Sequence, residues 1–145
     1  MTATASQYAT FVVGDHYLGI DVLDVQEVLR EQRITPVPLA PPEVAGLINL
    51  RGQIVPELDM RNLLCLSPRE PEDSRFSVVV RTEHGAVSLC VDQIDDVLEL
   101  DGSTFDAPPR NVDPHVRNLL LGVQKLQHRL LLILDIGRTV QAGGE

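Results

Sequence analysis

The residue types that most often carry out chemistry are dispersed along this chain. Its two cysteines, Cys65 and Cys90, both lie inside apolar runs, and no C-x-x-C spacing or neighbouring histidine completes a metal site. We interpret both as reduced, buried thiols that pack as small apolar side chains; a disulfide between them is the alternative. The four histidines are scattered over expected turns and loops, where the ordinary role is a solvated side chain: His16, His84, His115 and His128.

An acidic run is the nearest approach to a metal site. It comprises Asp92, Asp95, Asp96, Glu99 and Asp101. On a strand, Asp95, Glu99 and Asp101 share one face and Asp96 points to the other. We interpret the run as a solvated face that protects an edge strand from aggregation, with a cation site or a basic partner as the alternative. Because no nucleophile, metal cluster or phosphate-binding loop accompanies it, we expect no enzyme, no metal and no cofactor.

Arginine 51 is better placed to serve an interaction. It stands with Gly52 at a tight turn between two apolar segments, and the glycine supplies conformational freedom at the bend. A guanidinium presented there suits a carboxylate on a partner protein. A salt bridge to a local acid, Asp59 or Glu27, is the alternative, and the two interpretations are compatible.

The elements that position these residues are expected to be short strands. Apolar segments separated by turn residues predict four hairpins and one further strand, a pattern typical of barrels or sandwiches. The hairpins join residues 11–13 to 17–20, 47–50 to 53–55, 76–81 to 86–91 and 119–126 to 129–136, and the further strand covers residues 94–100.

Helices are expected to be few. Residues 22–30 are the best candidate, because Val22, Val25 and Leu29 lie along one helical face and Asp21 is placed to cap it. Residues 61–66 are expected to form one or two helical turns. Residues 35–42 contain too many prolines for a helix or a central strand and are expected to be an extended connector, and residues 101–114 are expected to be a long loop.

The length and the composition fit one small globular protein of two similar parts. The chain has 145 residues, 43% of them hydrophobic and 23% charged. Residues 67–74 lack apolar side chains, so we expect one domain over residues 1–145 with a first five-stranded barrel at 8–66 and a second at 76–140, joined by the loop 67–75.

The charge balance excludes some partners. Twelve Lys and Arg residues stand against 21 Asp and Glu, a net charge of -9, which argues against nucleic acid because phosphate binding requires clustered cations. No segment reaches the length of a membrane span, and the first ten residues contain neither a basic stretch nor a long apolar run. We therefore expect a cytoplasmic chain that does not insert into membranes.

Three segments make the sequence similar to a known family. Residues 17–30 (YLGIDVLDVQEVLR), 35–38 (TPVP) and 44–56 (VAGLINLRGQIVP) resemble the CheW family of chemotaxis coupling proteins. Residues 77–91, 97–100 and 121–136 follow the family's order of elements, so the resemblance extends from about Tyr8 to Val140. The Asn-Leu-Arg-Gly stretch with its flanks is the specific part of this resemblance.

The resemblance implies a fold and a function. The fold is mainly β, with two small five-stranded SH3-like barrels packed on a shared hydrophobic core and one or two short helices. The function is that of a non-catalytic adaptor that couples the cytoplasmic tips of chemoreceptors (methyl-accepting chemotaxis proteins) to the regulatory domain of the histidine kinase CheA. Other CheW-like domains are further expected partners, and these partners would recruit the protein to membrane receptor arrays.

Two alternatives to this function stay open at the level of sequence. The first is a CheW-like adaptor of a non-flagellar chemosensory system, which controls twitching motility or a second messenger. The second and less favoured is a small metal-dependent enzyme that uses the acidic run, since a fold alone does not fix an activity.

The resemblance also implies which residues contact partners. By matching position they are Val25 and Glu27, both in the expected helix, with Gly46 and Arg51. Val25 is suited to an apolar contact with a receptor helix, and ordinary core packing is the alternative of equal weight. Gly46 has an alternative role in permitting a close approach of the backbone.

Overall fold

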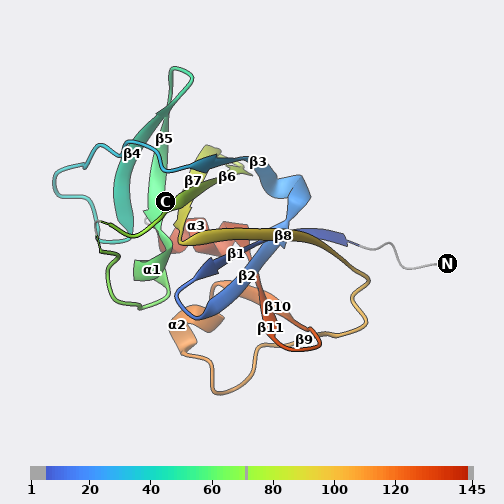
Figure 1. Cartoon of the computed structure of the whole chain (residues 1–145). Coiled ribbons are helices and arrows are strands. Elements are labelled where there is room, and N and C mark those ends of the chain that lie inside the picture. Colours follow the sequence, from blue (N-terminus) through green and yellow to red (C-terminus); the bar gives the residue numbers. More distant parts are fainter. Residues whose placement is uncertain (1–5, 71, 144–145) are drawn as a thin grey trace.

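The computed structural model describes residues 6–70 and 72–143, and it is built mainly of strands (Figure 1). None of the described helices is long and apolar enough to cross a membrane. The strands are β1 (Ser6–Val13), β2 (His16–Asp21), β3 (Val25–Arg30), β4 (Val44–Leu50), β5 (Gln53–Asp59), β6 (Phe76–Thr82), β7 (Gly85–Val91), β8 (Gln93–Leu100), β9 (Phe105–Asp106), β10 (Leu120–Lys125) and β11 (Leu130–Leu134). The short helices are η1 (Val22–Asp24), α1 (Met60–Leu63), α2 (Pro114–Arg117) and α3 (Ile136–Ala142).

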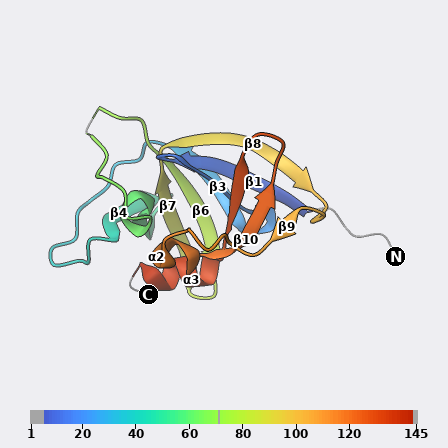
Figure 2. The same ribbon diagram turned by 90° about the horizontal axis from the view of Figure 1, so that it is seen from below.

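The strands form two sheets. A six-stranded sheet has the order β8-β1-β2-β11-β10-β9, and a five-stranded sheet has the order β3-β6-β7-β5-β4. Strand β8 lies beside β1 at the outer edge of the six-stranded sheet (Figure 2). Each sheet contains one parallel pair, β2 with β11 and β5 with β7, and the other neighbours are antiparallel.

The sheets do not follow the expected division of the chain. Each sheet takes strands from both sides of residues 67–75. The expectation of one barrel at residues 8–66 and a second at residues 76–140 is therefore wrong. The reason is that four strand pairs, β1–β8, β2–β11, β3–β6 and β5–β7, join segments far apart in sequence, which local turn patterns do not reveal.

All four expected hairpins and the expected strand at residues 94–100 are confirmed. The six-stranded sheet has one strand more than expected, because β9 lies within the expected loop 101–114 and pairs with β10. Helix α1 lies near the expected turn at residues 61–66, whereas α2 and α3 were not expected.

The expected helix at residues 22–30 is wrong beyond its first turn. Asp21 caps η1 as expected, since its carboxylate accepts the N–H of Leu23 at 2.9 Å. Residues Val25–Arg30 are then strand β3, which pairs with β6 along its whole length. The β-branched and apolar residues of this segment fit a strand equally well, and the neighbouring edge of β6 supplies the hydrogen bonds.

Buried side chains lie on both faces of each sheet. The main cluster lies between the sheets and includes Val78 and Val80 of β6 with Leu132 and Leu134 of β11. The residues between them face the other way: Val79 belongs to a small cluster inside the five-stranded sheet, and Leu131 and Ile133 to a small cluster inside the six-stranded sheet. This arrangement explains the continuous apolar runs of β6 and β11, and it confirms a mainly β fold around a shared core.

Candidate interaction surface

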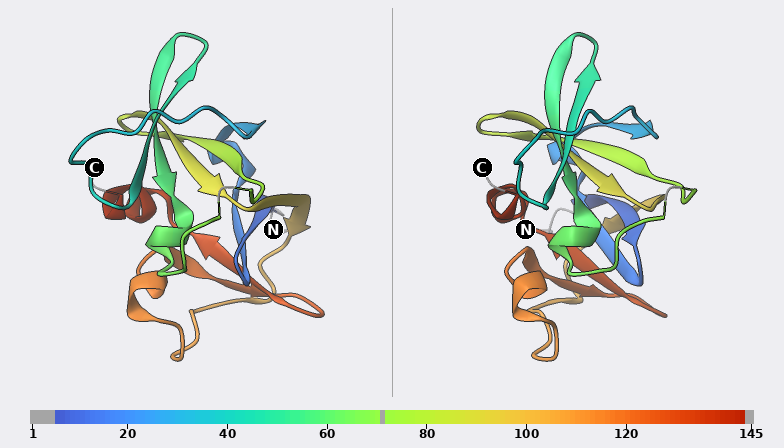
Figure 3. Two further views of the ribbon diagram at one scale, coloured as in Figure 1. Left: turned by 60° about the vertical axis from the view of Figure 1, so that its left-hand side comes forward. Right: turned by 90° about the vertical axis from the view of Figure 1, so that its left-hand side faces the viewer.

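The β4–β5 hairpin projects from the rest of the molecule (Figure 3), and Arg51 lies in its turn, between Leu50 of β4 and Gln53 of β5. Arg51 has φ 54 and Gly52 has φ 85, so both turn residues lie in the left-handed region. The turn is also held by the Gly52 N–H, which donates to Asn49 Oδ1 at 2.8 Å. A left-handed conformation costs a non-glycine residue about 1 kcal/mol, so this arginine occupies a mildly strained position.

Arg51 pairs with Glu27 of β3 through two hydrogen bonds. Its terminal nitrogens donate to Glu27 Oε2 at 2.7 Å and to Oε1 at 2.9 Å. The local partner is therefore Glu27 and not Asp59, whose carboxylate accepts backbone N–H groups at the start of α1. Strands β3 and β4 are the two edges of the five-stranded sheet, so this pair helps to close that sheet into a barrel.

The ion pair leaves part of Arg51 free to contact something else. Its side chain is 75% exposed, whereas that of Glu27 is 18% exposed. A guanidinium has five N–H donors, and only two of those on Arg51 find an acceptor among the described residues. The local pairing therefore leaves donors that point to solvent at the hairpin tip.

Gly46 permits a close approach of the backbone. Its φ is 153, and a Cβ there would collide with the carbonyl oxygen of Thr35 and lie 2.7 Å from Ile34 Cγ2. The connector is held against β4 by two hydrogen bonds between Thr35 and Leu47, at 2.8 and 2.9 Å. Gly46 therefore allows the connector to lie along β4, the edge strand that leads into the turn with Arg51.

Val25 lies apart from this pair, on the other face of the sheet. A β-bulge falls between Val25 and Glu27, so Val25 faces with Val80 toward the main cluster, whereas Glu27 faces with Val79. Val25 is half buried and packs against the main cluster. Of the four residues that the sequence indicated, the structure brings together Glu27 and Arg51 and separates Val25 from them.

Sequence reasoning missed an exposed apolar margin of the main cluster. Val28 shares the face of Val25 on β3 and is 42% exposed. On β8, Ile94 is 37% exposed and Val97 is 57% exposed. Their partners on β1, Phe11 and Ala9, belong to or pack against the same cluster. No signal in the sequence separates these side chains from buried ones. They are exposed because β3 and β8 are edge strands of the two sheets, and the sequence pattern does not show which strands are edges.

The acidic run divides into two parts. Asp92 is paired with Arg61 and Arg69 and accepts the N–H of Gly14 at 2.7 Å. Burial raises the pKa of Asp92, but the hydrogen bonds from Arg61, Gly14 and Arg69 outweigh it and hold that pKa below its usual value. The other carboxylates of the run, those of Asp95, Asp96, Glu99 and Asp101, are exposed. Within residues 6–70 and 72–143, no three His, Cys, Asp or Glu side chains are grouped as metal ligands.

The cysteines differ from each other. Both are free thiols, so the alternative of a disulfide is wrong. Cys90 is buried as expected, and burial raises its pKa to about 11. Cys65 is exposed, which corrects the expectation of a buried thiol, because the chain turns outward after α1 with Cys65 at φ 61.

Comparison with known proteins gives consistent matches. Residues 7–143 match the family described as the CheW-like domain. The chain is 30% identical to the chemotaxis protein CheW of Thermotoga maritima over 132 residues, 91% of this chain and 85% of that protein. It is 28% identical to the CheW of Treponema pallidum over 134 residues, 90% of this chain and 79% of that protein. The crystal structure of the scaffolding protein TtCheW from Thermoanaerobacter tengcongensis superposes with a TM-score of 0.81 at 25% identity, covering 90% of this chain and 89% of that one.

Proposed function

This chain belongs to the CheW-like family, whose members are non-catalytic scaffolding adaptors of chemotaxis, and on that premise we propose that it couples the cytoplasmic tips of chemoreceptors to the histidine kinase CheA. The observation that carries this proposal is the extent of the match. The fold agrees with a CheW scaffold over nine-tenths of both chains. A small metal-dependent enzyme, the less favoured alternative, does not fit a member of this family.

Two separate surfaces support binding to more than one protein. Val28 on β3, next to the half-buried Val25, and Ile94 and Val97 on β8 are exposed apolar side chains, and such side chains are suited to the apolar face of a receptor helix. The hairpin tip offers the free donors of Arg51, which suit a carboxylate of a receptor or of the kinase regulatory domain. Val28 and Glu27, which holds Arg51, lie on different faces of β3, so a partner bound at one of these side chains leaves the other uncovered.

We assign Glu27 and Gly46 to positioning roles in this function. Glu27 holds the guanidinium of Arg51 in a fixed orientation, which lowers the entropy lost when a partner binds. Gly46 lets the connector lie on β4 and so fixes the base of the hairpin. Through such contacts the protein is recruited from the cytoplasm to receptor arrays at the membrane, where other CheW-like domains are further partners.

Calorimetry with the complete chain tests the proposal. The titrants are the regulatory domain of the cognate CheA and a soluble fragment of a cognate chemoreceptor, without nucleotide or metal. We expect both to bind, and a pull-down with all three proteins should recover one complex. If neither partner binds at about 100 μM, the proposed function is wrong.

A further inference from the structure

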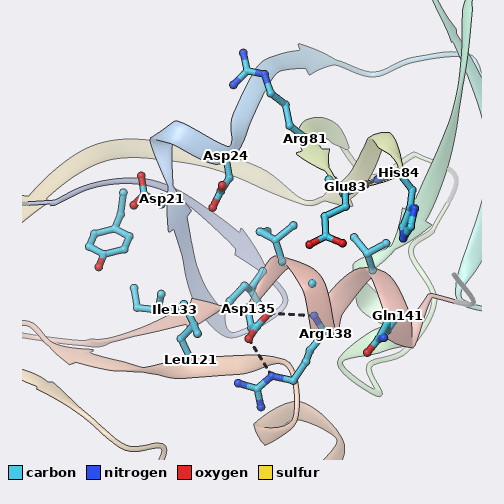
Figure 4. Close-up of a pocket in the computed structure, with 16 residues that line it drawn as sticks. Asp21, Asp24, Arg81, Glu83, His84, Leu121, Ile133, Asp135, Arg138 and Gln141 are labelled. Atoms are coloured by element: carbon cyan, nitrogen blue, oxygen red, sulfur yellow. Dashed lines mark hydrogen bonds and ion pairs between the residues drawn. The ribbon is translucent and has the colours of Figure 1, made fainter.

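A groove of about 910 Å³ lies where the two sheets meet α3 (Figure 4). One wall comes from η1 and the end of β6 with the turn that follows it, and the other from β10, β11 and α3. Val25, Glu27, Gly46 and Arg51 do not line it, so it is distinct from the surfaces assigned above.

An exposed leucine lines the second wall. Leu121 is 55% exposed although it belongs to a strand whose next three residues are buried. The cause is a β-bulge between Leu120 and Gly122, which leaves Leu121 without a cross-strand partner and turns it toward the groove. Ile136 of α3 adds a second, partly buried apolar side chain.

The first wall carries unbalanced negative charge. Asp21, Asp24 and Glu83 line it, and none of them has an ion-pair partner within the described part of the chain. The guanidinium of Arg81 instead donates to the backbone carbonyls of Leu23 and Val25, at 3.2 and 3.3 Å. On the opposite wall, Arg138 is paired with Asp135 at 3.0 Å. The groove therefore has excess negative charge on one side and an exposed apolar side chain on the other.

The titration of Asp24 is consistent with this excess charge. Burial raises its pKa, and the neighbouring carboxylate of Asp21 raises it further, while the charge of Arg81 only partly offsets these effects. A cation that entered the groove would offset both the desolvation of this carboxylate and its repulsion from Asp21.

We propose that this groove binds a basic amphipathic segment of a partner protein, whose Lys or Arg side chain meets Asp21, Asp24 and Glu83 while an adjacent apolar side chain packs on Leu121. The carboxylates and Leu121 lie on opposite sides of the groove, so an occupant must offer a cation and an apolar group together (Figure 4). A second copy of this chain is disfavoured because each copy has a net charge of -9. Nucleic acid is disfavoured by the sign of the groove's charge.

A peptide titration followed by NMR tests this proposal independently of any chemotaxis partner. The probe is a short synthetic peptide with leucines on one helical face and arginines beside them, titrated into the ¹⁵N-labelled complete chain. The comparison peptide carries glutamine in place of each arginine. We expect the arginine peptide to shift the amide signals of Leu121 and Gly137 in a saturable manner, and the glutamine peptide to bind at least tenfold more weakly.

Two double variants that each remove two negative charges test whether binding depends on this groove or on the negative charge of the whole protein. The double variant Asp24→Asn with Glu83→Gln should bind the arginine peptide about tenfold more weakly than the parent does. Asp96→Asn with Glu99→Gln removes the same charge from the exposed face of β8 and should leave the affinity unchanged. Leu121→Ala should also weaken binding, with little loss of stability because this side chain is exposed. Equal weakening by both charge pairs, equal binding of the two peptides, or shifts concentrated on β8 would each overturn the proposal.

Discussion

Arg51 forms a local ion pair with Glu27 and has donors left for an external partner. Because its side chain is largely exposed, the local ion pair contributes little to stability. An ion pair with one largely exposed member contributes about 0.5 kcal/mol to stability, whereas the left-handed turn costs about 1 kcal/mol. The structure therefore gains little net stability from having arginine here. A residue kept at a mildly strained tip with unused donors is better explained by contact with a partner than by folding.

We predict that substitutions of Arg51 reduce partner binding and leave the fold intact. Arg51→Ala should abolish measurable coupling to a receptor or kinase domain in calorimetry, with a fall in melting temperature of only a few degrees. Arg51→Gly is the matched control for strain, because it removes the same side chain and relieves the positive φ, so its stability should match the parent. Arg51→Lys keeps the charge but loses the two-point geometry, and should also bind more weakly. A fall of about 10 °C in Arg51→Ala would show a structural role instead.

Glu57 is a buried carboxyl group inside the five-stranded sheet. It is fully buried on β5, and Ser77 Oγ donates to its two oxygens at 2.8 and 3.2 Å. Burial raises its pKa above the ordinary value, although the nearby hydroxyls of Ser88 and Ser77 and the charges of Arg75 and Arg69 oppose this effect. Ser88 faces it on β7 and its hydroxyl has no partner within the described residues, so a protonated Glu57 has an acceptor close at hand.

We predict that Glu57 makes the protein less stable as the pH rises. A raised pKa means that the folded state holds this proton more tightly than the unfolded state. The contribution is therefore complete below the unfolded pKa of about 4.5 and is lost as the pH rises through the folded pKa. In urea unfolding over about pH 4 to 8, the difference in free energy between Glu57→Gln and the parent should shift in favour of glutamine with rising pH. A difference that stays constant with pH would contradict the prediction.

At the scale of elements, the sequence predicts strands correctly where two neighbouring strands are joined by a short turn. All four hairpins follow from turn residues between apolar segments, and Arg51 was placed at its turn correctly. The identity of β3 was not predictable in this way, because Val22, Val25 and Leu29 fit a helical face and only the pairing with β6 selects the strand. The choice of Glu27 over Asp59 as the partner of Arg51 depends on the closure of the five-stranded sheet, which no local pattern encodes.

The packing of the connector on β4 gives the prediction at this scale. Gly46→Ala should lower the free energy of unfolding by about 2–3 kcal/mol, because a methyl group would collide with backbone atoms of Thr35 in a left-handed conformation. Gly52→Ala is the matched control, since Gly52 also has a positive φ but no atom of the described residues lies within 4 Å of a new methyl group there. Its loss should be about 1 kcal/mol, from the backbone conformation alone. Equal losses in chemical denaturation would show that the close approach to Thr35 does not matter.

At the scale of the whole molecule, the two sheets are interwoven in sequence. The first two strands of the chain pair with β8 and β11, and β3 and β5 pair with the β6–β7 hairpin. The main cluster is shared by both sheets, and α3 covers part of it through Val140. Cutting the chain between α1 and β6 therefore separates strands that are neighbours in both sheets, so neither sheet survives in either fragment.

We therefore predict a single cooperative unfolding transition and no folded half. Each half contains roughly 70 residues, a size at which burial is marginal even with a complete set of strands, and each half lacks members of both sheets. Fragments 1–70 and 72–145 should each be unfolded or insoluble alone and should regain native chemical shifts when they are refolded together, because only the mixture restores the β2–β11 and β5–β7 pairs. The intact chain should give one calorimetric peak whose van't Hoff and calorimetric enthalpies agree. Two resolved transitions, or a fragment ending near Leu66 that folds alone, would show that pairing across the two halves is not what holds the sheets together.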